Sequence, residues 1–291
     1  YPSDATIHYT TDGSEPTEES PIAPPSLFID KTTIIRAKTF SDSALSKPSK
    51  TESYIFLGRN TNLPIISIAI DSLYLWDDEI GIYTKGTYGI NHPDAISEIP
   101  EWGNNFNYLF SWRRPINFEY YKKDQKINQI CEINIGGNSS RIEHIKSFVL
   151  HANERFGEKN FNYAFWDAKP NVTKNKSLYL RNSGQDLYST LLRDALIQLT
   201  MGNHVNIDWC AYQPAIILIN GNYYGITNIR ERHNEDYLLA NYNTKNIVLA
   251  DTWLTKEGPD IEFQKLKAII SDKNSSYEKI DSIIDLDEFS N

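Results

Sequence analysis

The chain contains few sulfur-bearing residues: two cysteines and one methionine among 291 residues. Cys131 and Cys210 lie in apolar, strand-like contexts and form no C-x-x-C pair, so the sequence excludes a disulfide-rich scaffold and a cysteine-based zinc ribbon. That context favours two buried free thiols, with a single disulfide as the alternative. The six histidines form neither an i,i+4 pair nor an H-E-x-x-H motif, so we expect no zinc site.

Long apolar runs are also absent. The densest run, residues 215–219, has the length of a strand, whereas a membrane-spanning helix needs roughly 20 apolar residues. The sequence has no G-x-S-x-G motif, and neither cysteine lies in a local histidine context, so nucleophilic hydrolysis is not indicated. The chain opens with Tyr1, as if cut from a longer precursor, so the lack of a signal peptide carries no information about the parent protein.

Basic residues are fewer than acidic ones, 29 against 38, which gives a formal net charge of -9. Nucleic acids and anionic membrane surfaces attract concentrated positive charge, so neither is an expected partner. Simple solubility explains the acidity equally well. The hydrophobic content of 40% and charged content of 23% are those of a folded globular protein. Aromatic residues reach 12%, with 18 tyrosines, which suits a β-rich extracellular protein.

Residues 1–57 read as short strands separated by turns. Residues 6–10 and 33–40 alternate between apolar and polar side chains, and Asp12-Gly13 follows the first of them as a hairpin signal. Residues 54–56 close the unit, and no helical spacing occurs within it. We therefore predict a compact β-sandwich.

After a polar linker at residues 58–62, strand and helix patterns mix. The clearest helix is predicted at residues 187–201, and a hairpin is predicted from 212 to 229 across the Asn220-Gly221-Asn222 turn. Residues 86–106 should form a long surface loop. The remaining predicted strands are residues 63–70, 115–121, 129–135, 147–150 and 178–180, and the remaining helices are 235–241, 262–270 and 277–284. The pattern indicates an α+β domain with a substantial antiparallel sheet.

The clearest candidate for a functional site is the GGNSSR motif at residues 136–141, which is followed by Lys146. A glycine-rich turn exposes backbone donors, and a nearby cation can reach the same anion, as a phosphate site requires. A plain hairpin with a surface lysine fits the same residues. Asp194 is a second candidate, as a catalytic acid, but its place on a helix beside Arg193 favours a structural Arg–Asp pair.

The N-terminal segment resembles a known accessory module. The letters IHYTTDGSEPT at residues 7–17, TIIRAK at 33–38 and the closing Tyr54 are similar to the Ig-like domain at the C-terminus of chitobiases and hexosaminidases. This resemblance implies a spacer or accessory module of a secreted protein, with sugar binding as its functional alternative.

From residue 63 to the end, the chain resembles the CotH kinase family. The resemblance rests on eight short motifs that occur in the expected order and not on any single one of them. They are LPIIS at 63–67, GIY at 81–83, RPI at 114–116, GGNSSR at 136–141 with KSF at 146–148, LRN at 180–182, LRDAL at 192–196, NGNYYGI at 220–226, and Glu231 with DYL at 236–238.

This resemblance implies an atypical protein kinase that binds ATP with Mg²⁺ or another divalent metal and phosphorylates serine on a protein partner. By analogy, Lys146 holds phosphate oxygens, Arg141 supports it, and Glu231 pairs with the cation or orients the nucleotide. Asn234 stands where the family often has an acidic residue. The catalytic and metal-binding aspartates of the family are expected beyond Asn291, so we expect that the fragment alone does not transfer phosphate.

The sequence thus predicts an α+β protein. A small N-terminal β-sandwich (residues 1–57) precedes a mixed, largely antiparallel-sheet kinase-like domain (residues 58–291) that is incomplete at its C-terminus. The leading interpretation is the nucleotide-holding part of a secreted or cell-envelope bacterial kinase. The alternative is a non-catalytic adhesion protein that presents the aromatic segment 83–112 to a glycan or a protein. A carbohydrate-active enzyme is a third, weaker interpretation.

Overall fold

The computed structural model describes residues 4–43, 45, 47–99, 105–202, 204, 208–251 and 254–287. Its N-terminal part is an antiparallel sheet in the order β1 (Thr6–Thr10), β2 (Thr33–Phe40) and β3 (Lys50–Tyr54). Both strands predicted from alternation, β1 and β2, are present. The Asp12 carboxylate accepts hydrogen bonds from the amide and hydroxyl of Ser14, which forms the turn after β1. This small β-region is consistent with an Ig-like domain.

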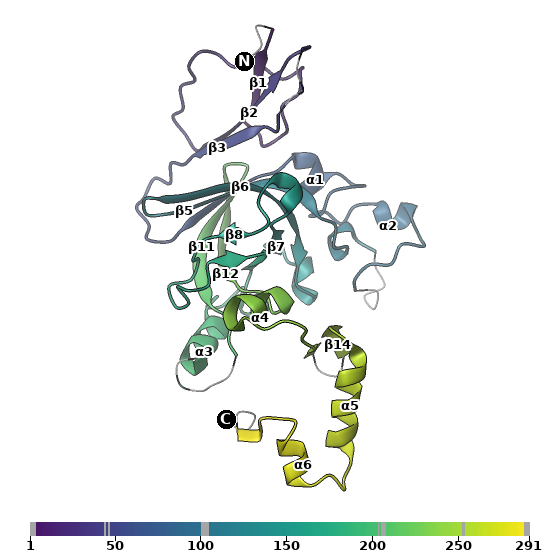
Figure 1. Cartoon of the computed structure of the whole chain (residues 1–291). Helices are drawn as coiled ribbons and strands as arrows, with labels where there is room; N and C mark the ends of the chain where they lie inside the picture. Colours follow the sequence, from purple (N-terminus) through teal and green to yellow (C-terminus); the bar gives the residue numbers. More distant parts are fainter. Residues whose placement is uncertain are drawn as a thin grey trace.

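A closed barrel forms the centre of the molecule (Figure 1). Around it the strands follow the order β10-β12-β11-β4-β5-β6-β7, and β7 pairs with β10 to close the ring. Every neighbouring pair is antiparallel except β4 with β11. Their bounds are β4 (Ile65–Ala69), β5 (Arg114–Lys122), β6 (Gln125–Gly136), β7 (Ser147–His151), β10 (Ser177–Arg181), β11 (Tyr212–Ile219) and β12 (Asn222–Arg230).

Two tight hairpins join β5 to β6 and β11 to β12 in antiparallel pairs. Lys123, between β5 and β6, has a φ of 54°, and Asn220 and Gly221, between β11 and β12, have φ values of 49° and 78°. Positive φ at these positions is the conformation that favours asparagine and glycine in short hairpin turns. The hairpin predicted across residues 220–222 is therefore confirmed.

The barrel interior holds one apolar core. Alternate side chains of the strands point inward, among them Ile66, Phe118, Phe148 and Leu178, each fully buried. Burial of such side chains contributes roughly 1.5–3 kcal/mol each relative to exposure. Cys131 lies in this core, and both cysteines are free and buried thiols.

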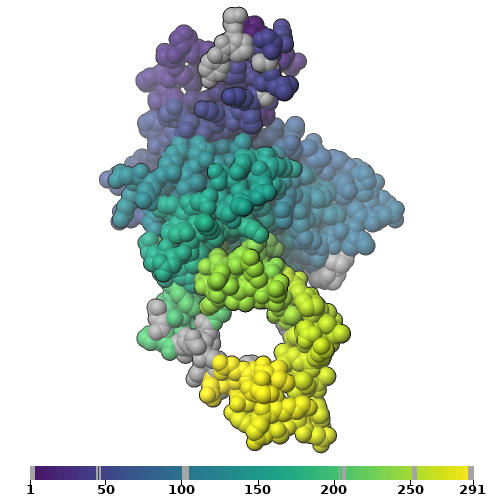
Figure 2. All heavy atoms as spheres, in the orientation of Figure 1, coloured from purple at the N-terminus to yellow at the C-terminus, as the bar shows by residue number. Residues whose placement is uncertain are grey.

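Helices and short strands surround the barrel. The helices are α1 (Ser72–Trp76), α2 (Tyr88–Asn91), α3 (Arg193–Gly202), α4 (Glu235–Tyr242), α5 (Asp260–Ser271) and α6 (Tyr277–Asp281). The short strands are β8 (Phe161–Asn162), β9 (Lys174–Asn175), β13 (Leu249–Asp251) and β14 (Leu254–Glu257). Figure 2 shows α5 and α6 as an arm that projects from the barrel, and neither helix contains a buried residue.

Several predicted elements differ in extent, among them β6, which was predicted at residues 129–135 and spans Gln125–Gly136. The helix predicted from residue 187 begins only at Arg193, because Leu191 adopts a φ of 61° and breaks the helical path. Leu192 and Leu196 of its expected apolar face are exposed. The helix predicted to end at residue 284 ends at Asp281. The predicted loop 86–106 contains the short α2, and its residues 100–104 lie outside the described part.

Polar contacts join the N-terminal sheet to the barrel. Glu119 of β5 is buried and accepts hydrogen bonds from the Ser53 amide, at 3.2 Å, and from the Ser53 hydroxyl. Lys126 reaches both Glu119, at 3.0 Å, and Glu52 of β3. Strand β3 lies over this face of the barrel. The face of β5 that carries the Glu119 carboxylate is therefore shielded from water.

Candidate functional site

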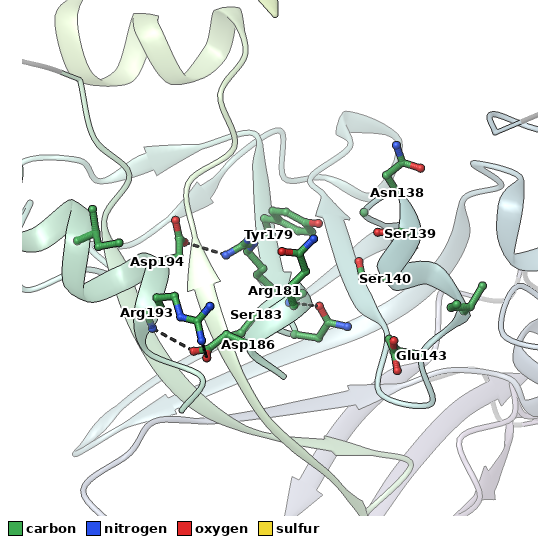
Figure 3. Close-up of a pocket in the computed structure, with 16 residues that line it drawn as sticks. Asn138, Ser139, Ser140, Glu143, Tyr179, Arg181, Ser183, Asp186, Arg193 and Asp194 are labelled. Carbon is green, nitrogen blue, oxygen red and sulfur yellow. Dashed lines mark hydrogen bonds and ion pairs between the residues drawn. The ribbon is translucent and has the colours of Figure 1, made fainter. Parts of the chain in front are cut away.

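The glycine-rich segment, residues 136–140, borders a cleft of about 590 Å³. We call this segment the glycine turn and the hollow the glycine-turn cleft. The opposite wall consists of the end of β10 and the segment that leads into α3 (Figure 3). The lining includes Ser139, Ser140, Tyr179, Arg181, Asp186 and Arg193.

Glycine is required in the turn for steric reasons. Gly137 has a φ of 92°, and a Cβ there would lie 2.4 Å from the Ser140 hydroxyl. A Cβ on Gly136 would lie 2.7 Å from the ring of Tyr179. A short 3-10 segment, Ser139–Ile142, begins within the turn, and its first amides have no partner within the segment. Gly137, Ser139 and Ser140 therefore line the cleft at a place where no larger side chain fits on the glycine.

The opposite wall carries paired charges. Asp194 accepts from Arg181 at 2.8 Å and from Arg230 at 3.1 Å, and its other oxygen accepts from Gln198. The interpretation of Asp194 as part of a structural Arg–Asp pair agrees with this geometry, although its partners are not the adjacent Arg193. Arg193 lies 3.5 Å from Asp186 and is largely exposed.

Asp186 organises the start of α3. Its carboxylate accepts from the Thr190 hydroxyl at 2.7 Å and from the Arg193 amide at 3.1 Å. These hydrogen bonds, first of all that of Thr190, lower the pKa of Asp186 to about 2. Sequence reasoning assigned no role to Asp186 or Arg181, although the LRN and LRDAL motifs lie close to them.

Arg141 points away from the cleft and into the protein. It is buried, and its guanidinium donates to the carbonyls of Gly137 (2.6 Å) and Leu109 (3.1 Å) and pairs with Glu98. It therefore fixes the glycine turn from behind.

Lys146 lies next to Arg141 and is equally buried. Its ammonium donates to the carbonyls of Arg141 and Glu143 and lies 4.3 Å from the ring centre of Tyr108. Burial lowers the pKa of Lys146 to about 8, against a smaller opposing effect of Glu143. Both predicted cations thus meet behind the glycine turn.

Glu231 does not join this pair. Its carboxylate contacts Lys169 at 2.8 Å, accepts from the Ala211 amide at 2.8 Å and accepts from Asn241 at 2.7 Å. Asn234, the departure from the family pattern, caps α4 by accepting from the Tyr237 amide. Asparagine caps a helix about as well as aspartate does.

The aromatic segment 83–112, the surface of the adhesion alternative, packs largely upon itself. Phe110 and Trp112 stack at 4.8 Å, Tyr88 meets both rings edge-on, and Arg114 lies over Trp112 at 5.3 Å. Tyr108 is buried in the core. These aromatic rings therefore pack mainly against one another.

A second titratable cluster lies beyond the barrel and was not expected from the sequence. The ring of His233 lies 3.1 Å from the Asp208 carboxylate and 3.2 Å from the Cys210 sulfur. Burial alone would raise the pKa of Asp208, but hydrogen bonds from His233, Tyr237 and Tyr242 together lower it to about 2. The hydrogen bond to Asp208, followed by that to Cys210, raises the pKa of His233 to about 10.

This cluster predicts a specific pH dependence. A folded pKa above the ordinary value of about 6.5 means that His233 stabilises the fold below about pH 6.5 and loses that contribution as the pH rises through about 10. NMR titration should find His233 still protonated at neutral pH. In Asp208→Asn the midpoint should fall toward about 6.5, whereas exposed Asp167→Asn should leave it unchanged. A midpoint near 6.5 in the unaltered chain would contradict the assigned pairing.

Two family models match the chain. The model described as CotH kinase protein matches residues 133–289, and the model described as Chitobiase/beta-hexosaminidase C-terminal domain matches residues 2–52. Both occur in the order that the motifs indicated. No curated protein matches the sequence. Across the described residues, no helix is both long and apolar enough to cross a membrane.

Proposed function

The chain belongs to the CotH kinase protein family, and from this premise we propose that the glycine-turn cleft holds the phosphates of ATP. The observation that carries the proposal is a turn that only glycine can form, bordering a cleft with two arginines on its opposite wall. The cleft volume of about 590 Å³ lies within the usual range for small-molecule sites.

The contacts proposed for the nucleotide follow from the lining. The hydroxyls of Ser139 and Ser140 and the turn amides donate to phosphate oxygens, and Arg181 and Arg193 supply positive charge. Ile142 and Ile197 are exposed at the same cleft, and their apolar surfaces suit a flat base. The lining therefore offers polar groups for the phosphates and apolar surface for the base, as a nucleotide requires.

Arg141 and Lys146 have a positioning role in this proposal. Their side chains hold carbonyls of Gly137, Arg141 and Glu143, and so keep the turn and the following loop in place. Direct contact between Lys146 and a phosphate would require its ammonium to leave these carbonyls. Glu231 pairs with Lys169 and not with Lys146, so this proposal gives Glu231 a structural role.

The carboxylates that line the glycine-turn cleft already have partners, so we assign none of them to the divalent metal that the family implies. Asp186 and Asp194 are already engaged by arginines, and Glu143 accepts from Tyr188. No group of three or more His, Cys, Asp or Glu side chains is placed to hold an ion in the described ranges. We therefore assign these residues to nucleotide binding alone. Serine phosphorylation of a protein partner, and a secreted or cell-envelope location, are proposed for the parent protein.

Calorimetric titration of the 291-residue chain with ATP, with and without Mg²⁺, tests this proposal. We expect measurable binding, and we expect Lys146→Ala to weaken it about tenfold or more because the turn loses two carbonyl anchors. The matched control is Lys159→Ala, which removes an exposed lysine and should have no effect. Absence of ATP binding, or equal affinity in Lys146→Ala, would refute the assignment of this cleft.

A further inference from the structure

A second hollow of about 630 Å³ lies where the N-terminal sheet meets the barrel. We call it the junction groove. One side is the turn after β1, with Thr11 and Asp12, and the other sides are α1 and the β11–β12 hairpin. Figure 1 shows α1 and this hairpin turn at the end of the barrel nearest to β1–β3. The groove is therefore built from both domains.

Close backbone contacts fix the shape of the groove. A Cβ on Gly13 would lie 2.1 Å from the Asn220 side chain, so the two turns touch at a position that admits only glycine. Asn220 is itself held by Ile70, whose amide donates to it at 2.9 Å and whose carbonyl accepts from it at 2.8 Å. The side walls are consequently set by the fold before any ligand binds.

Two aromatic side chains stand exposed along the groove. Trp76 of α1 is 57% exposed and Tyr223 of β12 is 63% exposed. Trp76 packs one side against Tyr83 at 4.8 Å, which orients the indole. The Tyr223 side chain has no hydrogen-bond or ring partner within the described ranges, although its backbone pairs with Leu218 in the β11–β12 ladder. Both exposed rings offer flat apolar faces beside water.

The rest of the lining combines polar groups with the apolar side chains of Leu75, Ile145 and Ile219, and it contains no lysine or arginine. Asp12, Ser72 and Asn222 contribute a carboxylate, a hydroxyl and an amide at the exposed rim, and His144 contributes an imidazole. A phosphate-bearing ligand needs concentrated positive charge, and this lining contains no cationic lysine or arginine to supply it. Flat apolar faces among hydrogen-bonding groups instead match a ligand that has C–H faces and a ring of hydroxyls.

We propose that the junction groove binds a neutral oligosaccharide of β-linked pyranoses. Sugars whose hydroxyls are all equatorial have apolar C–H faces that stack on Trp76 and Tyr223, while their edges exchange hydrogen bonds with Asp12, Ser72 and Asn222. The assignment is independent of nucleotide binding, because the groove and the glycine-turn cleft have no lining residue in common.

Saturation-transfer NMR and calorimetry with cellotriose and triacetylchitotriose, in the absence of ATP, test the proposal on the whole chain. We expect at least one trisaccharide to bind, and we expect Trp76→Ala and Tyr223→Ala each to weaken the affinity about tenfold. Tyr223 is mostly exposed and its removal spares the core, so this variant remains folded even if Trp76→Ala disturbs Tyr83. Tyr277→Ala, which removes an equally exposed tyrosine from α6, should leave the affinity unchanged.

Three outcomes would overturn the proposal. The first is that neither trisaccharide binds at millimolar concentration. The second is binding that survives both aromatic substitutions, which would place the sugar elsewhere. The third is binding of a lysine-rich peptide that Asp12→Asn abolishes, which would assign the groove to a cationic partner. Since ATP is absent, none of these results bears on the glycine-turn cleft.

Discussion

Glu231→Ala is expected to lower the free energy of unfolding by about 3–5 kcal/mol, the cost of breaking a buried ion pair from one side. Glu231 and Lys169 are both largely buried, with 2% and 12% of their side-chain surfaces exposed. Lys169 also donates to the Trp209 carbonyl at 2.6 Å and to Asn241 at 2.9 Å. Without the carboxylate, the ammonium group of Lys169 would remain largely buried without its paired carboxylate.

Urea denaturation measures this effect, and two further variants define its cause. Glu262→Ala removes the carboxylate of an exposed helical pair and should cost less than about 1 kcal/mol. Glu231→Gln combined with Lys169→Met removes both charges while keeping an acceptor for the Ala211 amide, and should recover much of the loss. If Glu231→Ala is as stable as the unaltered chain but loses ATP binding, the residue acts on the nucleotide and not on the fold.

Glu119→Ala is the second large expected effect, a loss of about 3 kcal/mol together with loosening of the N-terminal sheet from the barrel. Glu119 is 1% exposed and accepts from Ser53, from the Tyr121 hydroxyl at 2.7 Å and from Lys126 at 3.0 Å. Its removal takes away the acceptor of the Ser53 amide and the carboxylate that Ser53, Tyr121 and Lys126 share at the contact with β3.

The matched control for Glu119 is Glu52→Ala. Glu52 contacts the same Lys126 but is 56% exposed, so its removal should cost less than about 1 kcal/mol. Urea denaturation measures both variants, and limited proteolysis of the linker at residues 58–62 reports the loosening. Equal proteolysis rates in Glu119→Ala and in the unaltered chain would contradict a role for Glu119 in joining the two domains.

Strand β5 shows which structural features the sequence pattern predicts and which it does not. Alternation in residues 115–121 predicted the strand correctly, because Phe118 and Tyr120 share one face. The same alternation assigns Asn117 and Glu119 to a solvent face, yet both are buried. The N-terminal domain covers that face, and local periodicity carries no information about a segment that is 66 residues away along the chain.

In the candidate site, too, local sequence patterns predicted the backbone but not the long-range contacts. The GGNSSR letters located the turn, because glycine tolerates the positive φ and the close approach that the turn requires. The letters did not reveal that Arg141 and Lys146 point behind the turn, nor that Arg181 and Arg193 face it. The direction of a long charged side chain depends on which carbonyls and carboxylates other elements bring within reach.

By itself, the sequence determined the strand order of the hairpins, the turns at Gly13, Gly137 and Gly221, the presence of the main helices and membership of a family. These features depend on backbone preferences and on short-range periodicity. Only the tertiary structure decided that Glu231 pairs with Lys169, that Glu119 is buried beneath β3, and that the two domains enclose a groove beside Trp76 and Tyr223. Each of these joins residues far apart in the chain, and barrel closure and domain docking set which charges and rings meet.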